Sequence, residues 1–215
     1  MSPPTDRELV DALPEPLRQL AQRGEVKHFR KQQRLIEEGT QGDTLFVILA
    51  GRLRAYSADE RGREIVYGIH GPGEYLGEMS LDGGPRSASV MAEEPAVCAV
   101  ITRHTLLQHI AAHPGFALEL IGRVIRRARL ATQSARDMAL LDAYGRVVRL
   151  LESLAEAQPD GSRRISERLT HAEIAARVGC SREMISRLMK DLERGGYVQT
   201  AADGSRTIQA LPAHW

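Results

Sequence analysis

The stretch that most restricts how this chain can fold is residues 115–141, which run without a proline or an internal cluster of turn residues. Such a run predicts a single helix about 40 Å long, at about 1.5 Å of rise per residue. Small apolar residues recur along it in alternating steps of four and three, the a/d spacing of a seam between helices. Such a narrow stripe needs a partner, and we expect the same helix of a second copy, in a parallel homodimer. The stripe starts at Ala117, and the expected dimer contacts are Ile121, Val124, Ala128, Ala131, Ala135 and Met138.

The alternative partner for this stripe is the chain's own N-terminal domain. Both contacts are possible if each uses a different face of the helix. Five arginines lie off the stripe and are not among the expected dimer contacts: Arg123, Arg126, Arg127, Arg129 and Arg136.

The composition predicts a folded, soluble protein. The 215 residues include 29 Lys+Arg, 28 Asp+Glu and 42% hydrophobic residues, a balance that disordered chains lack. No apolar run reaches the roughly 18 residues of a membrane-spanning helix, and the polar N-terminus MSPPTDREL is unlike a secretory signal. Cys98 and Cys180 form neither a disulfide framework nor a zinc-binding spacing. We therefore expect a protein of the reducing cytoplasm, with no membrane partner and no metal.

The segments on either side of the long helix have different periodicities. In residues 25–104, short apolar runs alternate with glycine-rich turns, which is typical of a small β-barrel or sandwich. After the long helix come a second amphipathic helix, a helical pair and a strand–turn–strand segment with an Asp-Gly turn. We therefore predict an α+β fold with three parts, at residues 1–112, 113–142 and 143–215.

Residues 170–194 have the pattern of a helix–turn–helix. Thr170 is placed to cap the first helix, with Glu173 completing a capping box, and Gly179 is placed to end that helix. Ser181 is placed to cap the second helix. The residues expected to face inward from the second helix are Met184, Ile185, Leu188, Met189 and Leu192.

The outer side of this second helix has the chemistry of a DNA reader. Arginine can donate two hydrogen bonds to guanine, and glutamate can accept one from cytosine. The first turns of a recognition helix reach the base edges in the major groove, and a helix N-terminus suits a phosphate. The alternative is an exposed charged helix in an ordinary helical hairpin. The expected DNA-binding residues are Thr170, Ser181, Arg182, Glu183, Ser186, Arg187 and Lys190.

The segment GCSREMISRLMKDLERGGYV resembles the winged helix of the Crp/Fnr transcription regulators, and is most similar to the cyclic-AMP receptor branch. The resemblance extends over nearly the whole chain, as an effector domain of jelly-roll type, a dimerisation helix and a winged helix–turn–helix. It implies that Arg182, Glu183 and Arg187 read a TGTGA-type half-site. It also implies a palindromic operator bound by a two-fold dimer, with RNA polymerase as a further partner.

GEYLGEMSLDGGPRSASV, residues 73–90, resembles the phosphate-binding cassette of cyclic-nucleotide domains. Arg86 is suited to pair with a cyclic phosphate, and Ser87 can complete the phosphate cradle. Glu78 can hold the ribose hydroxyl, while Gly77 permits a close backbone approach. The resemblance implies an effector site formed by Gly77, Glu78, Met79, Arg86, Ser87 and Thr132.

Two departures leave the ligand open. The stretch from Glu78 to Arg86 is one residue shorter than the family pattern. The Thr–Ser pair that meets adenine in the cyclic-AMP branch is here Ala131–Thr132. Cyclic AMP, another cyclic nucleotide such as cyclic di-GMP, or no ligand at all are each compatible with these residues.

Other cofactors and function classes receive less support. The family's iron–sulfur sensors use several N-terminal cysteines, and this chain has none before Cys98. We expect no haem, and we expect His109 and His113 to be solvated surface residues rather than metal ligands. No nucleophile elbow, P-loop, zinc-protease motif or dinucleotide fingerprint occurs, so we expect no catalytic residues and no enzyme. A regulatory module that does not bind DNA is the rival class.

Overall fold

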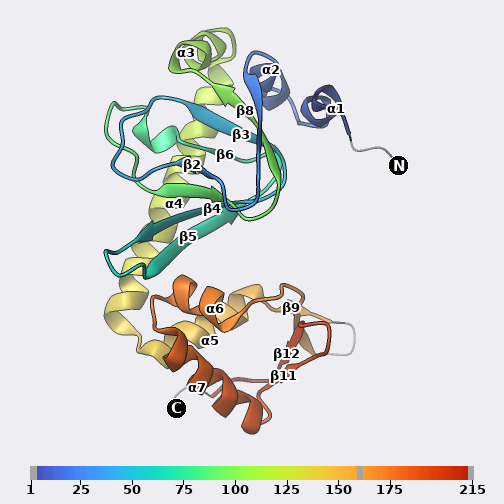
Figure 1. The fold of residues 1–215 in the computed structure, drawn as a ribbon, viewed down its shortest axis with the longest axis vertical. Coiled ribbons are helices and arrows are strands. Elements are labelled where there is room, and N and C mark those ends of the chain that lie inside the picture. Colours follow the sequence, from blue (N-terminus) through green and yellow to red (C-terminus); the bar gives the residue numbers. More distant parts are fainter. Residues whose placement is uncertain (1–3, 159–161, 213–215) are drawn as a thin grey trace. The chain divides into compact units, whose positions relative to one another are not determined.

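The computed structural model describes residues 4–158 and 162–212 of the chain, so both ends of the sequence lie outside it (Figure 1). The chain divides into two compact units, and each is described by itself. The first is Met1–Ser57 with Val66–Arg129, and the second is Ala58–Ile65 with Leu130–Trp215. The predicted α+β class is confirmed: a β-rich N-terminal domain is followed by a long helix and a helix–turn–helix domain.

The N-terminal domain contains two four-stranded sheets, which fits the predicted jelly-roll-like barrel (Figure 1). Their strand orders are β1-β8-β3-β6 and β2-β7-β4-β5, and neighbours in the order are hydrogen-bonded. The strands are β1 (Glu25–Phe29), β2 (Arg34–Ile36), β3 (Leu45–Ala50), β4 (Leu53–Ala58), β5 (Glu64–His70), β6 (Tyr75–Leu76), β7 (Ser89–Ala92) and β8 (Ala96–Ile101).

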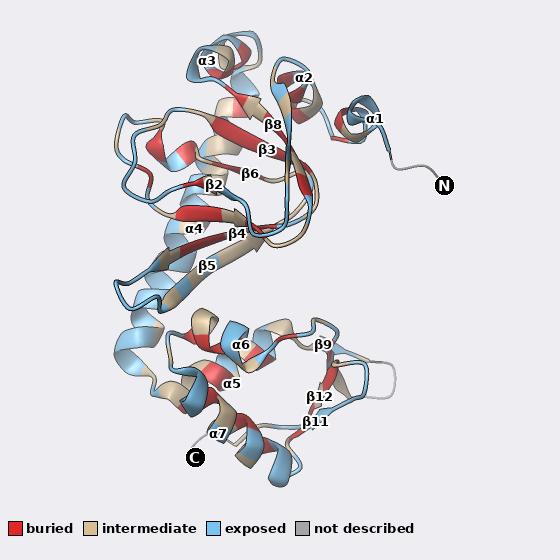
Figure 2. Ribbon diagram, viewed as in Figure 1, coloured by how far each residue is buried: buried red, intermediate tan, exposed pale blue. Residues whose placement is uncertain are grey.

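Strand β3 shows why the domain holds together, since five of its six residues are buried (Figure 2). Its side chains alternate between two cores, as the period of two in a strand requires. Leu45 and Val47 join the core that also holds Leu20 and Phe116. Ile48 joins the other core, which contains the predicted buried cysteine. Burial raises the pKa of that cysteine, Cys98, to about 12, so it is an inert packing residue.

Short helices close one side of the first core. Helix α1 has the capping box of Thr5 and Glu8, in which each side chain bonds the other residue's backbone N–H. Thr102 caps α3 through the N–H of Thr105. These helices are α1 (Asp6–Asp11), α2 (Leu17–Ala21) and α3 (Arg103–Ala112). The 3-10 turn η1 (Glu78–Ser80) follows β6.

The long helix is confirmed as α4 (Pro114–Leu140), within one residue of the predicted bounds. Phe116 is its buried residue, and it anchors the start of the helix against Tyr75 and His109. All six expected dimer residues are exposed in the single chain: Ile121, Val124, Ala128, Ala131, Ala135 and Met138.

One histidine prediction for this region is wrong. His109 is buried rather than solvated, and its ring packs edge-on against Phe116 at 5.1 Å between centroids. The reason is tertiary: α3 turns this face toward the start of α4, which its own weak amphipathic pattern did not reveal. His113, at the end of α3, is half-buried, with its ring 4.7 Å from that of His109.

The second unit contains three helices around one core and a small antiparallel sheet of order β11-β12-β10-β9. The predicted strand–turn–strand is confirmed as β11 and β12, with Val198 opposite Ile208. The elements are α5 (Ala143–Leu154), β9 (Glu156–Ala157), β10 (Arg163–Ile165), α6 (His171–Val178), α7 (Arg182–Arg194), β11 (Val198–Thr200) and β12 (Arg206–Ile208).

Candidate functional site

Gly77 sets the shape of the predicted cassette. Its φ of 95° lies in the left-handed region that favours glycine, and it precedes the turn η1. A Cβ atom added here would lie 2.5 Å from the carbonyl oxygen of Thr44, which is too close for any side chain. The cassette therefore approaches the loop before β3 as closely as only glycine allows.

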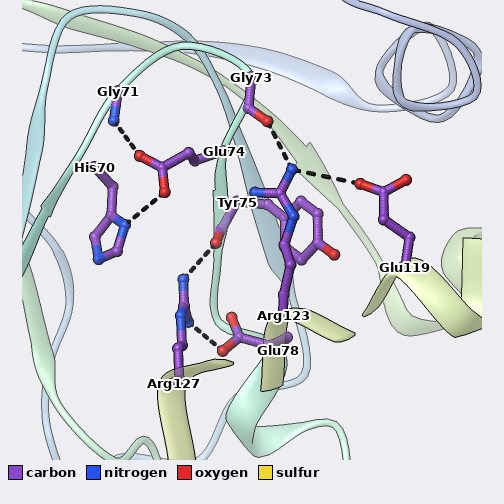
Figure 3. Close-up of polar contacts among 9 residues, drawn as sticks. All are labelled: His70, Gly71, Gly73, Glu74, Tyr75, Glu78, Glu119, Arg123 and Arg127. Atoms are coloured by element: carbon purple, nitrogen blue, oxygen red, sulfur yellow. Dashed lines mark hydrogen bonds and ion pairs between the residues drawn. The ribbon is translucent and has the colours of Figure 1, made fainter. Parts of the chain in front are cut away.

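Glu78, the next residue, is a buried carboxylate with only 4% of its surface exposed. It forms an ion pair with Arg127 of α4, and Arg127 also donates to the carbonyl oxygen of Tyr75 at 2.9 Å (Figure 3). The second carboxylate oxygen of Glu78, Oε2, is buried with no hydrogen-bond partner within the described residues. A buried acceptor without a partner is rare, so this oxygen is suited to accept a hydrogen bond from a ligand hydroxyl.

Arg123 lies one turn before Arg127 and faces the same segment. Its guanidinium stacks over the Tyr75 ring at 4.2 Å, and its Nη2 donates to the carbonyl oxygen of Gly73 at 3.1 Å (Figure 3). It also pairs with Glu119 at 3.4 Å. Burial raises the pKa of Tyr75 to about 12, and the charge of Arg123 opposes that rise. The two arginines thus join α4 to the strand that leads into the cassette.

Arg86, the predicted phosphate ligand, is also buried, at 6% exposure. Burial lowers the pKa of its guanidinium from its usual value, while Asp43 and Glu78 oppose that shift. Its Nη1 donates to the carbonyl oxygen of Gly77 at 2.9 Å, so the structure brings the predicted residues Gly77 and Arg86 into contact. Both terminal nitrogens are engaged by protein acceptors, including Thr44 and Ser80.

The other predicted effector residues lie at the surface. Met79 is 51% exposed, and the Ser87 hydroxyl donates to its sulfur at 3.5 Å. Thr132 is exposed and lies in the second unit, so its contact with the cassette stays a prediction. Sequence reasoning missed Thr44, Ser80 and Arg127. A signal existed for Arg127, because Arg123 and Arg127 stand four apart off the apolar stripe.

The helix–turn–helix has the local geometry that the sequence predicts. Thr170 and Glu173 form a capping box at the start of α6. Gly179 ends that helix with φ 66°, in the left-handed region. The Ser181 hydroxyl accepts from the N–H of Met184 at 3.2 Å, which caps α7. These three residues fix where the second helix begins and which side chains it presents.

The outer side of α7 is polar and exposed at Arg182, Glu183, Arg187 and Lys190. The backbone N–H of Glu183 itself and the Ser181 hydroxyl lower the pKa of the Glu183 carboxyl, which keeps this acceptor ionised at neutral pH.

Three residues at this surface differ from what the sequence predicts. Ser186 is half-buried, and its hydroxyl contacts Nδ1 of His171 at 3.0 Å. His171 is therefore a residue of this surface that sequence reasoning missed. Met184, expected to face inward, is 42% exposed. The buried positions of α7 are Ile185, Met189 and Leu192, spaced four and three apart, and Met184 stands about 100° off that stripe.

Arg146 fixes the turn between α6 and α7. Its Nε donates to the carbonyl oxygen of Val178 at 2.9 Å and its Nη2 to the sulfur of Cys180 at 3.2 Å. Its Nη1 donates to the carbonyl oxygen of Leu141 at 2.8 Å, just after α4. One side chain therefore connects the end of the long helix, α5 and the start of α7.

The described residues contain neither a candidate metal site nor a candidate membrane-spanning helix. No group of three or more histidine, cysteine or acidic residues able to hold a metal ion occurs in residues 4–158 and 162–212. Within the same ranges, none of the helices combines the length and apolar character needed to cross a membrane.

Comparison with known proteins agrees with the domain architecture. The family model "Cyclic nucleotide-binding domain" matches residues 26–113, and "Crp-like helix-turn-helix domain" matches residues 145–213. A cAMP-activated global transcriptional regulator CRP of Salmonella typhimurium is 32% identical over 166 residues, covering 74% of this chain and 78% of that protein. A CRP-like cAMP-activated global transcriptional regulator of Mycobacterium tuberculosis is also 32% identical, covering 75% and 74%.

Among solved structures, the c-di-GMP responsive global regulator CLP of Xanthomonas campestris has a TM-score of 0.74 at 24% identity. That match covers 89% of this chain and 96% of the solved one, and it supports the fold. The sequence relatives and both family models support the assignment directly. The chain belongs to the Crp family of DNA-binding transcription regulators, with a cyclic nucleotide-binding domain before a Crp-like helix–turn–helix domain.

Proposed function

We propose that this chain is a homodimeric, sequence-specific transcription regulator whose DNA binding is controlled by a cyclic nucleotide in the N-terminal domain. The observation that carries the proposal is the state of Glu78. Its buried carboxylate uses one oxygen for Arg127 and keeps the other, Oε2, without a partner in the described chain. That arrangement suits a ribose hydroxyl next to the helix on which the dimer is expected to form.

The residues of the cassette fit a cyclic nucleotide. Oε2 of Glu78 would accept the ribose hydroxyl, and the exposed Ser87 hydroxyl would donate to the phosphate. Arg86 supplies the positive charge for the phosphate, and Thr132 would approach the base. We favour cyclic AMP, because relatives at 32% identity are named as cAMP-activated.

Cyclic di-GMP is the second candidate. One solved structure of similar fold is that of a c-di-GMP responsive regulator, and the shortened cassette favours a ligand of different shape. Both candidates share a phosphate and a ribose-type sugar, so the same protein groups would serve either.

The dimer would form through the stripe of α4. All six expected dimer contacts are exposed in the single chain, and several large apolar neighbours are exposed as well, including Leu118 and Ile125. Such an apolar surface on a long helix suits burial against an identical helix.

The DNA contacts would come from α7 of each copy. Arg182 and Arg187 would donate to guanine and Glu183 would accept from cytosine, in TGTGA-type half-sites one helical turn apart. Thr170, Ser181, Ser186 and Lys190 would bind or position the phosphates beside them. RNA polymerase in the cytoplasm would be the partner that converts DNA binding into a change in transcription.

Control requires that the ligand prefer one state of the dimer over the other, since only differential affinity shifts an equilibrium. Arg127 is placed to transmit such a preference. It belongs to the expected dimer helix and also holds the carboxylate that would receive the ribose. A ligand hydroxyl bonded to Glu78 would change the electrostatic interaction between this carboxylate and Arg127, and with it the position of α4.

The test is a fluorescence-anisotropy titration of a palindromic TGTGA-type duplex with the full chain, in one salt buffer, without nucleotide, with cyclic AMP and with cyclic di-GMP. Tighter binding with cyclic AMP supports the proposal, and tighter binding only with cyclic di-GMP selects the second candidate. Equal binding in all three conditions would show a regulator that no cyclic nucleotide controls. Absence of binding in all three would contradict the half-site.

A further inference from the structure

Arg86 donates four hydrogen bonds to groups of its own domain. Its Nη1 donates to the carbonyl oxygen of Gly77 at 2.9 Å and to the Ser80 hydroxyl at 2.8 Å. Its Nη2 donates to the carbonyl oxygen and the hydroxyl of Thr44, at 3.0 and 2.9 Å. A guanidinium has five N–H bonds, so both hydrogens of each terminal nitrogen are in use.

The fifth N–H, on Nε, lies on an edge that the backbone closes. A Cβ atom added to Gly42 would lie 2.8 Å from both Nε and Nη2 of Arg86. A phosphate held in the bidentate way takes two N–H bonds from one edge of the guanidinium. The four acceptors occupy every N–H bond of the two terminal nitrogens. The edge that carries Nε–H faces Gly42. A phosphate therefore has to displace at least one internal acceptor to pair with this arginine.

The main chain of Arg86 is tied to the same loop. Its N–H donates to the carbonyl oxygen of Thr40 at 2.8 Å, and its carbonyl oxygen accepts from the N–H of Gly39 at 2.8 Å. The loop of residues 39–44, between β2 and β3, is thus held to Arg86 by both backbone and side chain. Since only 6% of Arg86 is exposed, uncovering the guanidinium requires breaking contacts with this loop.

We infer that Thr44 and Ser80 are internal competitors for Arg86, and that their hydroxyls set how tightly this cassette binds a phosphate-bearing effector. Release of Arg86 from the 39–44 loop accompanies binding. The inference rests on the proposed cyclic-nucleotide function and adds the residues that determine affinity. It also explains how a cassette one residue shorter stays closed, because Ser80 stands within that shortened stretch and bonds both Arg86 and the Gly77 carbonyl.

The test compares full-length wild type with Thr44→Val, Ser80→Ala and the double variant by isothermal titration with cyclic AMP. Thr40→Val is the matched control, because its hydroxyl bonds the Glu37 carbonyl and a side-chain change leaves its own carbonyl in place. Each single variant removes one competing hydroxyl and is expected to bind about three- to tenfold more tightly, with a larger gain for the double variant. Thr40→Val is expected to bind as wild type does.

A second measurement tests the internal tie without nucleotide. Arg86→Lys keeps the charge but loses the planar fork, so the thermal midpoint of the N-terminal unit is expected to fall. Arg103→Lys, at an exposed position of α3, is the control and is expected to keep the wild-type midpoint.

The outcomes separate the inference from the proposed function. Equal or weaker cyclic-AMP binding by Thr44→Val and Ser80→Ala would overturn the inference, because the hydroxyls would then hold Arg86 in its binding position. Equal thermal midpoints for Arg86→Lys and Arg103→Lys would show that the internal hydrogen bonds of Arg86 do not stabilise the N-terminal unit. If wild type and the double variant both fail to bind cyclic AMP, the assignment of cyclic AMP as effector and the competition of the hydroxyls with it are both wrong. The thermal midpoints then still test whether the bonds of Arg86 stabilise the N-terminal unit.

Discussion

Arg127 of the long helix forms an ion pair with Glu78, whose side chain is almost fully buried in the cassette. The pair connects the helix expected to form the dimer with the residue expected to receive the ligand's sugar. Removing one partner of a buried pair leaves a charge without compensation, which is costly in a medium of low dielectric constant.

Arg127→Gln is therefore expected to destabilise the N-terminal unit by about 2–4 kcal/mol, somewhat below the range for fully buried pairs because Arg127 is partly exposed. The free energy of unfolding from guanidinium titration measures this. Arg126→Gln, at an exposed position one residue earlier, is the control. Equal stability of the two variants would show that the pair contributes nothing.

Val124→Glu is expected to convert the proposed dimer to monomers, because it places a charge in the middle of the apolar stripe. Light scattering after size-exclusion chromatography measures the mass directly. Leu107→Glu changes an exposed leucine of α3 in the same way and is expected to leave the dimer intact. A dimeric Val124→Glu protein would move the interface off this stripe.

Arg182→Ala and Arg187→Ala are each expected to cost about 1–3 kcal/mol of binding free energy on a TGTGA-type site and to relax base preference at one position. Competition with single-base variants of the duplex measures both effects. Arg194→Ala, at the exposed end of α7, is the control. The same loss on random DNA would mean that these arginines bind the backbone and do not read bases.

Stability is expected to fall as the pH drops below 6.5, in part because of His109. Burial lowers the pKa of this histidine from 6.5, and the nearby charges of His113 and Arg23 lower it further, while Glu15 opposes them. Below pH 6.5 the unfolded chain binds a proton that the native state resists, so the free energy of unfolding decreases toward the lowered pKa and is fully retained above 6.5. Denaturant titrations at several pH values measure the slope.

His109→Gln is expected to have a shallower slope than wild type over this range, whereas the exposed His104→Gln is expected to keep the wild-type slope. The same slope in all three proteins would remove His109 as the cause.

The parts of the fold that were predictable from the sequence depend on residues close together in the chain. Thr170, Glu173 and Gly179 determine a capping box and a helix end within ten positions, so local rules locate them. The long helix was equally predictable, because nothing in residues 115–141 interrupts it.

The contacts around Arg86 and Glu78 were not predictable in this way. Thr44 lies 42 positions from Arg86, and Arg127 lies 49 positions from Glu78. Their approach is decided by the packing of β3, β6 and α4, not by a local pattern. The burial of His109 is not visible in the sequence for the same reason, since it comes from Phe116 on the next helix.

The measurement that tests the central claim most directly is the gain in DNA affinity caused by cyclic AMP, compared between wild type and Glu78→Gln. The substitution keeps the shape of the side chain but removes the charged acceptor and its pairing with Arg127. We predict that cyclic AMP tightens wild-type binding to the palindromic duplex and that Glu78→Gln loses about tenfold or more of that gain, with DNA binding in the absence of nucleotide retained. An equal gain in both proteins would contradict control of this regulator through Glu78.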